Sequence, residues 1–200
     1  FRGSSYTLRG ETMSGNYFEN QVVIVTGAGR GLGRAHAIAL AAEGASVLVN
    51  DLGVSREGQE ASSSPAEQVV EEILEMGGIA EVNSGDVADW QQAEEMVSHA
   101  IEKWGRLDAL ICNVGFLRDR MLVSMSEEEW DSVIRVHLKG HIAPARHAAN
   151  HWRNLAKEGK ETEGRIVMTS SGAGLMGSVG QGNYAAAKAG IALLVLQAAE

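Results

Sequence analysis

The chain has 200 residues, of which 44% are hydrophobic and 22% are charged, a composition typical of a globular protein with one domain. Its formal net charge of −9 argues against nucleic acid as a partner, because phosphate backbones attract basic surfaces. No apolar run approaches the length that crosses a bilayer, so insertion into a membrane is not expected.

The only cysteine, Cys112, cannot form an intramolecular disulfide, and the sequence contains no zinc-ligand spacing. We therefore predict no metal site and a reducing compartment: a cytoplasmic protein, or a peroxisomal one if the source is eukaryotic. His147 and His151 are four residues apart, but without a third ligand we interpret them as part of a solvated helix face. The other histidines without ligand geometry are His36, His99 and His141.

Residues 1–12 begin without methionine and show no hydrophobic periodicity, whereas Met13 and the residues after it resemble a native start. We expect 1–12 to be a disordered extension and 13–200 to be the folded domain.

Short apolar runs alternate with helical periods along the rest of the chain. The expected strands are 21–26, 45–51, 79–87, 106–115 and 163–171. The expected helices are 31–44, 65–78, 89–105, 126–152 and a last one from about 183 onward. Capping boxes mark two of the starts, Ser64 with Glu67 and Ser126 with Glu129. This alternation predicts an α/β fold, a doubly wound parallel sheet (Rossmann fold) with helices on both faces and ligands beyond the carboxyl ends of the strands.

The first expected strand ends in TGAGRGLG, residues 26–33. The glycines Gly27, Gly31 and Gly33 have the spacing G-x-x-x-G-x-G; Leu32 stands where G-x-G-x-x-G would need a glycine, and no P-loop lysine follows. A turn of this kind either is only a tight turn or lets a pyrophosphate approach backbone N–H groups at a helix N-terminus.

Asp51 ends the second expected strand, where a carboxylate can accept hydrogen bonds from the ribose hydroxyls of a dinucleotide. Its charge would repel a 2′-phosphate, so we predict NAD rather than NADP. Arg30, within the glycine turn, argues the other way because it could reach a 2′-phosphate.

Two further strand ends carry candidate cofactor contacts. Asp86 is placed to bond the adenine amino group, and the Val87 backbone to hold the ring edge. Asn113 and Gly115 are expected beside the glycine turn. Each one alone is as well explained by an ordinary turn, but four consecutive strand ends together favour a nucleotide site.

An alanine-rich helix near the end of the chain carries Tyr184 and, four residues later, Lys188, so both lie on one helix face. An isolated pair of this kind would be interpreted as a surface pair. The motifs TGAGRGLG, GDV, CNVG, the serines 170–171 and YAAAK together, however, resemble the short-chain dehydrogenase/reductase family over roughly residues 20–200. The segments GFLRDRML and RVHLKGH look most similar to the (3R)-hydroxyacyl-CoA and hydroxysteroid dehydrogenase domain of peroxisomal multifunctional enzymes and its bacterial relatives.

The resemblance implies an oxidoreductase that moves a hydride between a secondary alcohol, of hydroxyacyl-CoA or hydroxysteroid type, and a nicotinamide. A phenol needs help to act as a base near neutrality. Tyr184 is then the acid/base, and Lys188 favours the phenolate and binds the nicotinamide ribose. Ser171, thirteen residues before Tyr184, orients the substrate oxygen.

Two positions depart from the usual family pattern. Cys112 replaces an asparagine and is assigned no chemistry. His137 stands where many members have the asparagine that holds a relay water, so it is either a participant in that relay or a packed structural histidine.

Family members continue through a further helix and further strands, so we expect the last strands of the sheet to lie beyond residue 200. The resemblance also implies a homodimer or homotetramer formed through the 126–152 helix and the Tyr184 helix. Two alternative functions stay open, a non-redox epimerase or dehydratase and a catalytically silent nucleotide-binding assembly module.

Overall fold

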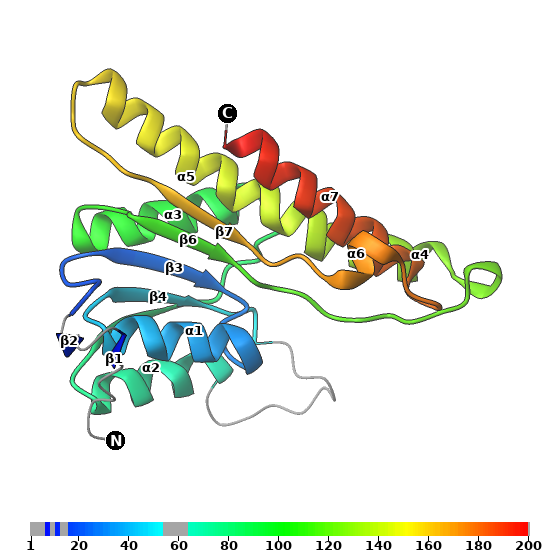
Figure 1. The fold of residues 1–200 in the computed structure, drawn as a ribbon, viewed down its shortest axis with the longest axis horizontal. Coiled ribbons are helices and arrows are strands. Elements are labelled where there is room, and N and C mark those ends of the chain that lie inside the picture. The colour runs from blue at the N-terminus through cyan, green and yellow to red at the C-terminus, as the bar shows by residue number, and fades with distance from the viewer. Residues whose placement is uncertain (1–6, 9–10, 13–15, 54–63, 200) are drawn as a thin grey trace.

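The computed structural model describes residues 7–8, 11–12, 16–53 and 64–199 and contains a five-stranded parallel sheet (Figure 1). The spatial order of its strands is β5-β4-β3-β6-β7. Their bounds are β3 Val22–Thr26, β4 Ser46–Asn50, β5 Ile79–Asn83, β6 Ala109–Cys112 and β7 Arg165–Met168. All four neighbouring pairs are parallel, so every carboxyl end lies at the same edge of the sheet. This confirms the predicted α/β fold.

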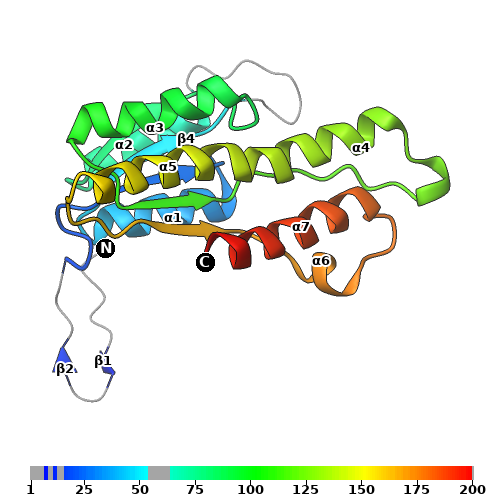
Figure 2. The same ribbon diagram turned by 90° about the horizontal axis from the view of Figure 1, so that it is seen from above.

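Helices cover both faces of the sheet (Figures 1 and 2). One face is covered by α1 (Gly31–Ala42) and α2 (Pro65–Glu75), and the other by α3 (Trp90–Trp104), α5 (Gly140–Lys157) and α7 (Gly182–Ala198). Figure 2 shows α7 lying alongside the long helical segment whose last part is α5.

Strand alternation produces two separate hydrophobic cores. In β3, Val22 and Ile24 point to the core under α3 and α5, whereas Val23 and Val25 point to the core over α1 and α2. All four side chains are at most 2% exposed, because a parallel sheet in a doubly wound fold is buried on both faces.

The expected strands and helices are present, and the differences concern their ends. The third strand ends at Asn83, so the stretch SGDV is a loop rather than part of a strand. Both predicted capping boxes form: the Ser64 and Ser126 hydroxyls accept from the N–H groups of Glu67 and Glu129, whose carboxylates accept in return.

The helix expected over 126–152 is longer and less regular than predicted. It consists of α4 (Glu127–Ile134), a π-helical turn η2 (Arg135–Lys139) and α5, which continues to Lys157. In the π-turn the Gly140 N–H donates to Arg135 O, five residues back. Hydrophobic periodicity does not reveal one extra residue in a turn, and π-turns are frequent at functional sites.

Four short elements were not predicted. A two-residue antiparallel pair, β1 (Thr7–Leu8) with β2 (Glu11–Thr12), lies within the stretch expected to be disordered, and the rest of residues 1–12 lies outside the described residues. The 3-10 helix η1 (Leu122–Ser124) and α6 (Gly172–Met176) follow β6 and β7. Most of the loop after Asp51, residues 54–63, also lies outside the described residues. Within the described ranges, no helix is long and apolar enough to span a bilayer.

Candidate active site

From β3 the chain adds β4 and β5 on one side and then returns to add β6 and β7 on the other side. The neighbouring strands β3 and β6 therefore form the topological switch point, where ligands bind in such folds. Thr26, the last residue of β3, joins them. Its Oγ1 donates to Ile111 O at 3.4 Å and accepts from the backbone N–H groups of Asn113 and Val114 at 3.1 and 3.5 Å. The ends of the two strands are thereby held together beneath the glycine turn.

The glycine turn has no room for side chains at two of its predicted positions. A Cβ on Gly33 would lie 2.1 Å from Gly27 O, and one on Gly27 would lie 2.7 Å from the Val114 Cα. Gly27 and Gly31 also have φ values of +62° and +55°, which side chains rarely adopt. Gly31 has nothing within 4 Å of its Cβ position, so the space beside it is open.

The N-terminus of α1 faces this open space without a side-chain cap. Arg30 is the N-cap residue, and its side chain makes no capping hydrogen bond. Arg30 and Leu32 have exposed side chains, and the backbone N–H of Leu32 lies in the first turn of α1, where a helix offers no internal acceptor. Uncapped N–H groups at the positive end of a helix, beside glycines that admit no Cβ, fit the pyrophosphate of a dinucleotide.

Asp51 lies beside the glycine turn and has a role that sequence reasoning missed. Its two carboxylate oxygens accept from Gly29 N at 3.0 Å and Gly53 N at 2.9 Å. A Cβ on Gly29 would lie 2.8 Å from the Asp51 Oδ2, so the carboxylate packs directly against the turn. Each oxygen retains a further acceptor site. Asp51 therefore orients the turn and can still bind ribose hydroxyls.

Asp86 has partners within the protein. Its carboxylate accepts from Ala88 N at 2.8 Å and from the Arg135 Nη2 at 2.6 Å. Burial alone would raise its pKa, but the Arg135 and Ala88 hydrogen bonds and the charges of Arg135 and Lys139 lower it overall. The sequence does not predict the pairing of Arg135 with Asp86, because the two residues are 49 positions apart. Val87 is 5% exposed and packs against Gly140, so only its backbone is available to an adenine.

Asn113 contacts the glycine turn, whereas Gly115 contacts His137. The Asn113 Nδ2 donates to Gly27 O at 3.5 Å, and its Oδ1 accepts from the Thr169 hydroxyl at 3.4 Å. A Cβ on Gly115 would lie 2.2 Å from the His137 Cε1. The imidazole of His137 therefore requires glycine at position 115.

Tyr184, Lys188 and His137 meet beyond the carboxyl ends of β6 and β7. The Lys188 Nζ lies 5.7 Å from the Tyr184 ring centroid, and the His137 ring meets the Tyr184 ring edge-on at 5.1 Å. Lys188 is 2% exposed and donates to Thr169 O at 2.5 Å. Burial lowers the pKa of Lys188 to about 8, because a cation is poorly solvated there.

The two serines after β7 have different positions. Ser170 donates to Lys188 O at 2.8 Å, which ties the end of β7 to α7. Ser171 is the N-cap residue of α6, and its Oγ accepts from Ala173 N at 3.2 Å. The hydroxyl hydrogen of Ser171 has no acceptor among the described residues, so it is available to a substrate oxygen.

His137 is 2% exposed and sits in the π-turn η2. Its Nε2 lies 2.8 Å from Phe116 O and 3.1 Å from Phe116 N, while its Nδ1 has no hydrogen-bond partner within the described ranges. Burial lowers its pKa to about 4, and the charge of Lys188 acts in the same direction.

Three further residues of β6 and α5 are buried. His141 is fully buried, and burial together with the charges of Lys188 and His137 lowers its pKa to about 3. Burial raises the pKa of Cys112 to about 12, which keeps it a thiol. His147 is 5% exposed and packs edge-on against Trp90, so its assignment to a solvated face was wrong. Trp90 lies on α3 and His147 on α5, so only the packing of the two helices reveals this contact.

Comparison with known proteins identifies the family. Residues 21–200 match the family described as short chain dehydrogenase. The chain belongs to the short-chain dehydrogenase family. Its fold resembles a crystal structure of a short chain dehydrogenase from Mycobacterium avium, with a TM-score of 0.86 and 59% identity over 91% of this chain and 65% of that one.

Two named relatives match most of this chain. The hydroxyacyl-CoA dehydrogenase ChsB1 of Mycobacterium tuberculosis is 49% identical over 90% of this chain and 56% of its own length. The peroxisomal multifunctional enzyme type 2 of Mus musculus is 46% identical over 87% of this chain and 22% of its own length. The chain thus spans about half of the first relative and about a fifth of the second.

Acidification is expected to destabilise this short-chain dehydrogenase through its buried imidazoles. The pKa values of His137 and His141, about 4 and 3, lie below the unfolded value near 6.5, so the unfolded state binds more protons at mildly acidic pH. This contribution to stability is fully present above the unfolded pKa and is lost as pH falls toward 4. The free energy of unfolding, measured by urea titration, should fall by about 2–3 kcal/mol per pH unit near pH 5.

The variant His141→Leu isolates one of the two imidazoles. As pH falls, the free energy of unfolding of this variant should decrease less steeply than that of the wild type, by about 1.4 kcal/mol per pH unit, because one of the two titrating groups is removed. An unchanged slope would mean that His141 is not held neutral in the folded state.

Proposed function

We propose that this protein is an NAD-dependent dehydrogenase of secondary alcohols in which Tyr184 is the acid/base. The observation that carries the proposal is the meeting of Tyr184 and a buried Lys188 with His137 at the end of the sheet where the glycine turn lies. The glycine turn and Asp51 would hold a dinucleotide, whose nicotinamide would supply the hydride acceptor.

In alcohol oxidation, Tyr184 takes the hydroxyl proton as the hydride leaves the carbon. The Lys188 ammonium, 5.7 Å from the ring centroid, favours the negative phenolate electrostatically. Lys188 uses one of its three N–H donors on Thr169 O, which leaves donors for the ribose hydroxyls of the cofactor. Ser171 donates its hydroxyl hydrogen to the substrate oxygen and orients it toward Tyr184.

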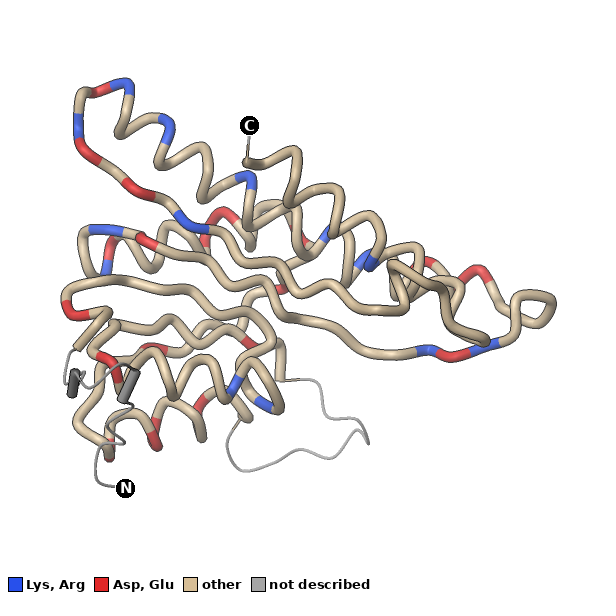
Figure 3. Tube along the Cα trace, in the orientation of Figure 1, with Lys and Arg blue, Asp and Glu red and all other residues tan. Residues whose placement is uncertain are grey.

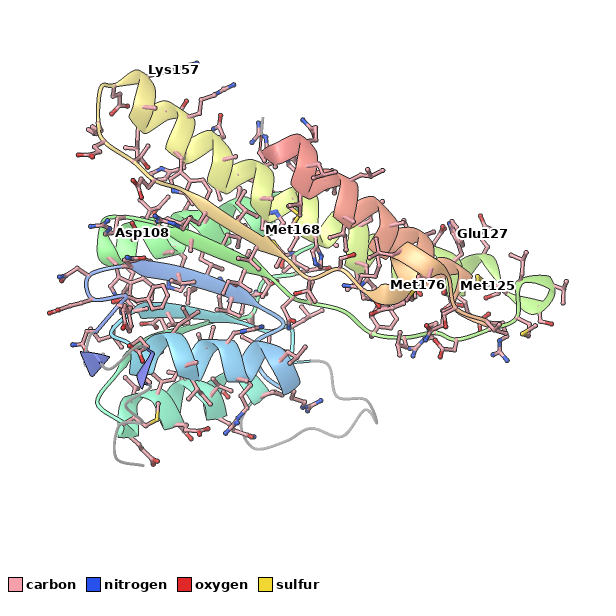
Figure 4. The ribbon with its side chains drawn as sticks, viewed as in Figure 1. Asp108, Met125, Glu127, Lys157, Met168 and Met176 are labelled. Atoms are coloured by element: carbon pink, nitrogen blue, oxygen red, sulfur yellow. The ribbon has the colours of Figure 1, made fainter. Side chains whose placement is uncertain are left out.

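The surroundings of this site support a substrate with a large apolar part. Figure 4 shows Met125 and Met176 at the same end of the molecule, beyond the carboxyl end of β7 at Met168. Two segments lie at this end, one that follows β6 and one that follows β7. Their exposed apolar side chains are Leu117, Met121, Leu122, Val123, Leu175, Met176 and Val179. An isolated bridge between Arg120 and Gln181 joins the segments. An acyl thioester or a steroid would cover this surface, in agreement with the hydroxyacyl-CoA dehydrogenase named among the relatives.

The test of the function is reduction of the cofactor with a 3-hydroxyacyl-CoA as hydride donor. We expect kcat/KM for NAD to exceed that for NADP by about tenfold or more, because the Asp51 carboxylate repels a 2′-phosphate. Initial rates of nicotinamide reduction measure this ratio. Calorimetric titration with NADH and NADPH, without substrate, measures the preference independently of the choice of alcohol.

Two outcomes would contradict these proposals separately. Tighter binding of NADPH would mean that Arg30 outweighs Asp51 in cofactor selection. Tight NADH binding without oxidation of any hydroxyacyl-CoA or hydroxysteroid would favour the non-redox or silent alternatives.

We also propose that the protein forms a homodimer or homotetramer in a reducing compartment, the cytoplasm or the peroxisome. Along α7 the only charged residue is Lys188 (Figure 3), and Leu193, Val195 and Leu196 are 68%, 39% and 65% exposed. The one charged residue of α7 is buried, so its exposed face is apolar and suits burial against a second copy.

A further inference from the structure

Asn183 directly precedes Tyr184 and takes no part in the proton and hydride transfers proposed above. It is the second residue of α7, and its side chain is 0% exposed. Asparagine is common near helix ends, so the sequence gives no reason to single this residue out. A buried amide, however, must find hydrogen-bond partners within the protein, and those partners define what it holds together.

Both ends of the Asn183 amide are engaged. Its Nδ2 donates to Arg118 O at 3.1 Å and to Glu129 O at 2.9 Å, and its Oδ1 accepts from Tyr184 N at 2.8 Å. Both amide hydrogens are thus used, and the opposite orientation of the amide would place its oxygen against two carbonyl oxygens. The three partners therefore hold the side chain in one orientation.

The three partners belong to three different segments of the chain. Tyr184 lies on α7, Glu129 lies in the first turn of α4, and Arg118 lies in the segment 113–126, between β6 and α4. Figure 1 shows α4, α6 and the start of α7 at the same end of the molecule. One buried amide thus joins the helix that carries the proposed acid/base to the segment whose exposed apolar side chains would contact the substrate.

The Tyr184 N–H needs this acceptor because of its place in α7. Tyr184 is the third residue of the helix, and the N–H groups of a first turn have no acceptor within the helix. The N-cap residue, Gln181, makes no side-chain capping hydrogen bond. Gly180 O, four residues before Tyr184, accepts from Arg120 N at 2.7 Å. The Asn183 Oδ1 therefore takes the place of a cap and fixes the backbone from which the Tyr184 side chain extends.

Two further pairs brace the same segments at the surface. The Gln181 Nε2 donates to the Asp119 carboxylate at 3.1 and 3.3 Å, and Arg120 donates to the Glu129 carboxylate at 2.8 and 3.0 Å. Both pairs are exposed, so water competes for their hydrogen bonds, whereas the Asn183 side chain has no contact with solvent. Loss of the Asn183 amide should therefore move the start of α7 more than loss of either surface pair.

We propose that Asn183 is a positioning residue for Tyr184, which holds the first turn of α7 against α4 and the segment 113–126 and so fixes the phenol oxygen where the substrate hydroxyl binds. This inference rests on the proposed function, in which Tyr184 takes the hydroxyl proton as the hydride leaves the carbon. Proton transfer requires the two oxygens within hydrogen-bond reach, and a misplacement of about 1 Å can cost about a hundredfold in rate. Asn183 acts through the position of Tyr184 and not on the substrate.

The first test separates catalysis from folding and from binding. In Asn183→Ala we expect kcat for oxidation of a 3-hydroxyacyl-CoA to fall by about 30-fold, because Tyr184 is no longer held in position. KM for the thioester should stay within about threefold and the dissociation constant for NADH within about twofold. Steady-state kinetics and calorimetric titration measure these quantities. The matched control is Asn150→Ala, which should keep the wild-type values because Asn150 accepts a hydrogen bond from Arg153 of its own helix, α5.

Two results of this test would overturn the proposal. A wild-type kcat with a lower urea midpoint of unfolding would mean that Asn183 contributes to stability alone. A raised KM with an unchanged kcat would mean that Asn183 shapes the substrate surface and not the position of the acid/base.

The isosteric variant Asn183→Asp covers the case in which alanine is not tolerated. One carboxylate oxygen can still accept from Tyr184 N, but the other has no hydrogen to offer to Arg118 O and Glu129 O. We expect kcat to fall by at least about tenfold, because the first turn of α7 loses both ties to the neighbouring segments. A kcat within about twofold of the wild-type value would show that these ties do not position Tyr184, and would contradict the inference.

A third test uses the cofactor-free protein and does not depend on turnover. In the wild type, exchange of the Tyr184 amide hydrogen, followed by NMR in heavy water, should be at least about tenfold slower than in an unstructured peptide, although first-turn amides have no acceptor within their helix. The same amide should exchange freely in Asn183→Ala and stay slow in Asn150→Ala. Free exchange in the wild type would overturn the inference even in an inactive protein. A wild-type protein that shows the slow amide but oxidises no alcohol would contradict the proposed function alone.

Discussion

Replacing Tyr184 with phenylalanine is expected to lower kcat by about 10³-fold while the dissociation constant for NADH stays within about twofold. The substitution removes only the phenol oxygen, so the ring still packs edge-on against His137 and near Lys188. Without that oxygen the substrate hydroxyl has no base within the site. Steady-state oxidation of the alcohol and calorimetric titration with NADH measure the two quantities.

Tyr17→Phe is the matched control for this experiment. Tyr17 is 51% exposed and precedes β3, far in sequence from the helix that carries Tyr184. The control should keep full turnover. Turnover by Tyr184→Phe at a rate near that of the wild type would refute the assignment of the acid/base, whatever its cofactor affinity.

Gly33→Ala is expected to weaken dinucleotide binding by about a hundredfold and to destabilise the fold by about 1–3 kcal/mol. The new Cβ would lie 2.1 Å from Gly27 O, which is backbone and cannot rotate away, and 2.8 Å from the Asn113 Nδ2. Relief of this clash must move the glycine turn, the N-terminus of α1 or the end of β6. The glycine turn and the N-terminus of α1 are predicted to hold the pyrophosphate, and the end of β6 lies beside them.

Gly182→Ala is a control with the same chemical change. At Gly182 the nearest atom to a new Cβ is the flexible Met125 Cε at 3.9 Å, and the residue opens α7. This variant should bind NADH as the wild type does and unfold at the same or a higher urea concentration. If Gly33→Ala behaved in the same way in calorimetry and urea titration, the glycine turn would not be the cofactor site.

Part of this protein could be predicted from local sequence alone. The strands of the sheet are short apolar runs, and the helix starts at Ser64 and Ser126 are made by residues three positions apart. The spacing of Tyr184 and Lys188 follows from the helical period. Such features depend on neighbours in sequence, so they are visible without a fold.

The roles of the site residues depend on contacts between residues far apart in the chain. Asp51 was predicted as a ribose ligand, but its hold on Gly29 follows from the return of β4 beside β3. The ion pair of Asp86 with Arg135 joins residues 49 positions apart, and only the packed sheet and helices bring them together. Sequence reasoning therefore identified the residues but not their partners.

The sequence by itself determined the doubly wound fold, the glycine turn and the Tyr184–Lys188 pair, because each is encoded by a local pattern of residue types. Only the tertiary structure decided that a π-turn presents His137 to the backbone N–H and C=O of Phe116 and that His141 and Lys188 are buried. The physical reason is that burial and hydrogen-bond partners are set by the elements that pack around a side chain. Those elements come from β6, η2, α5 and α7, which no window of sequence contains together.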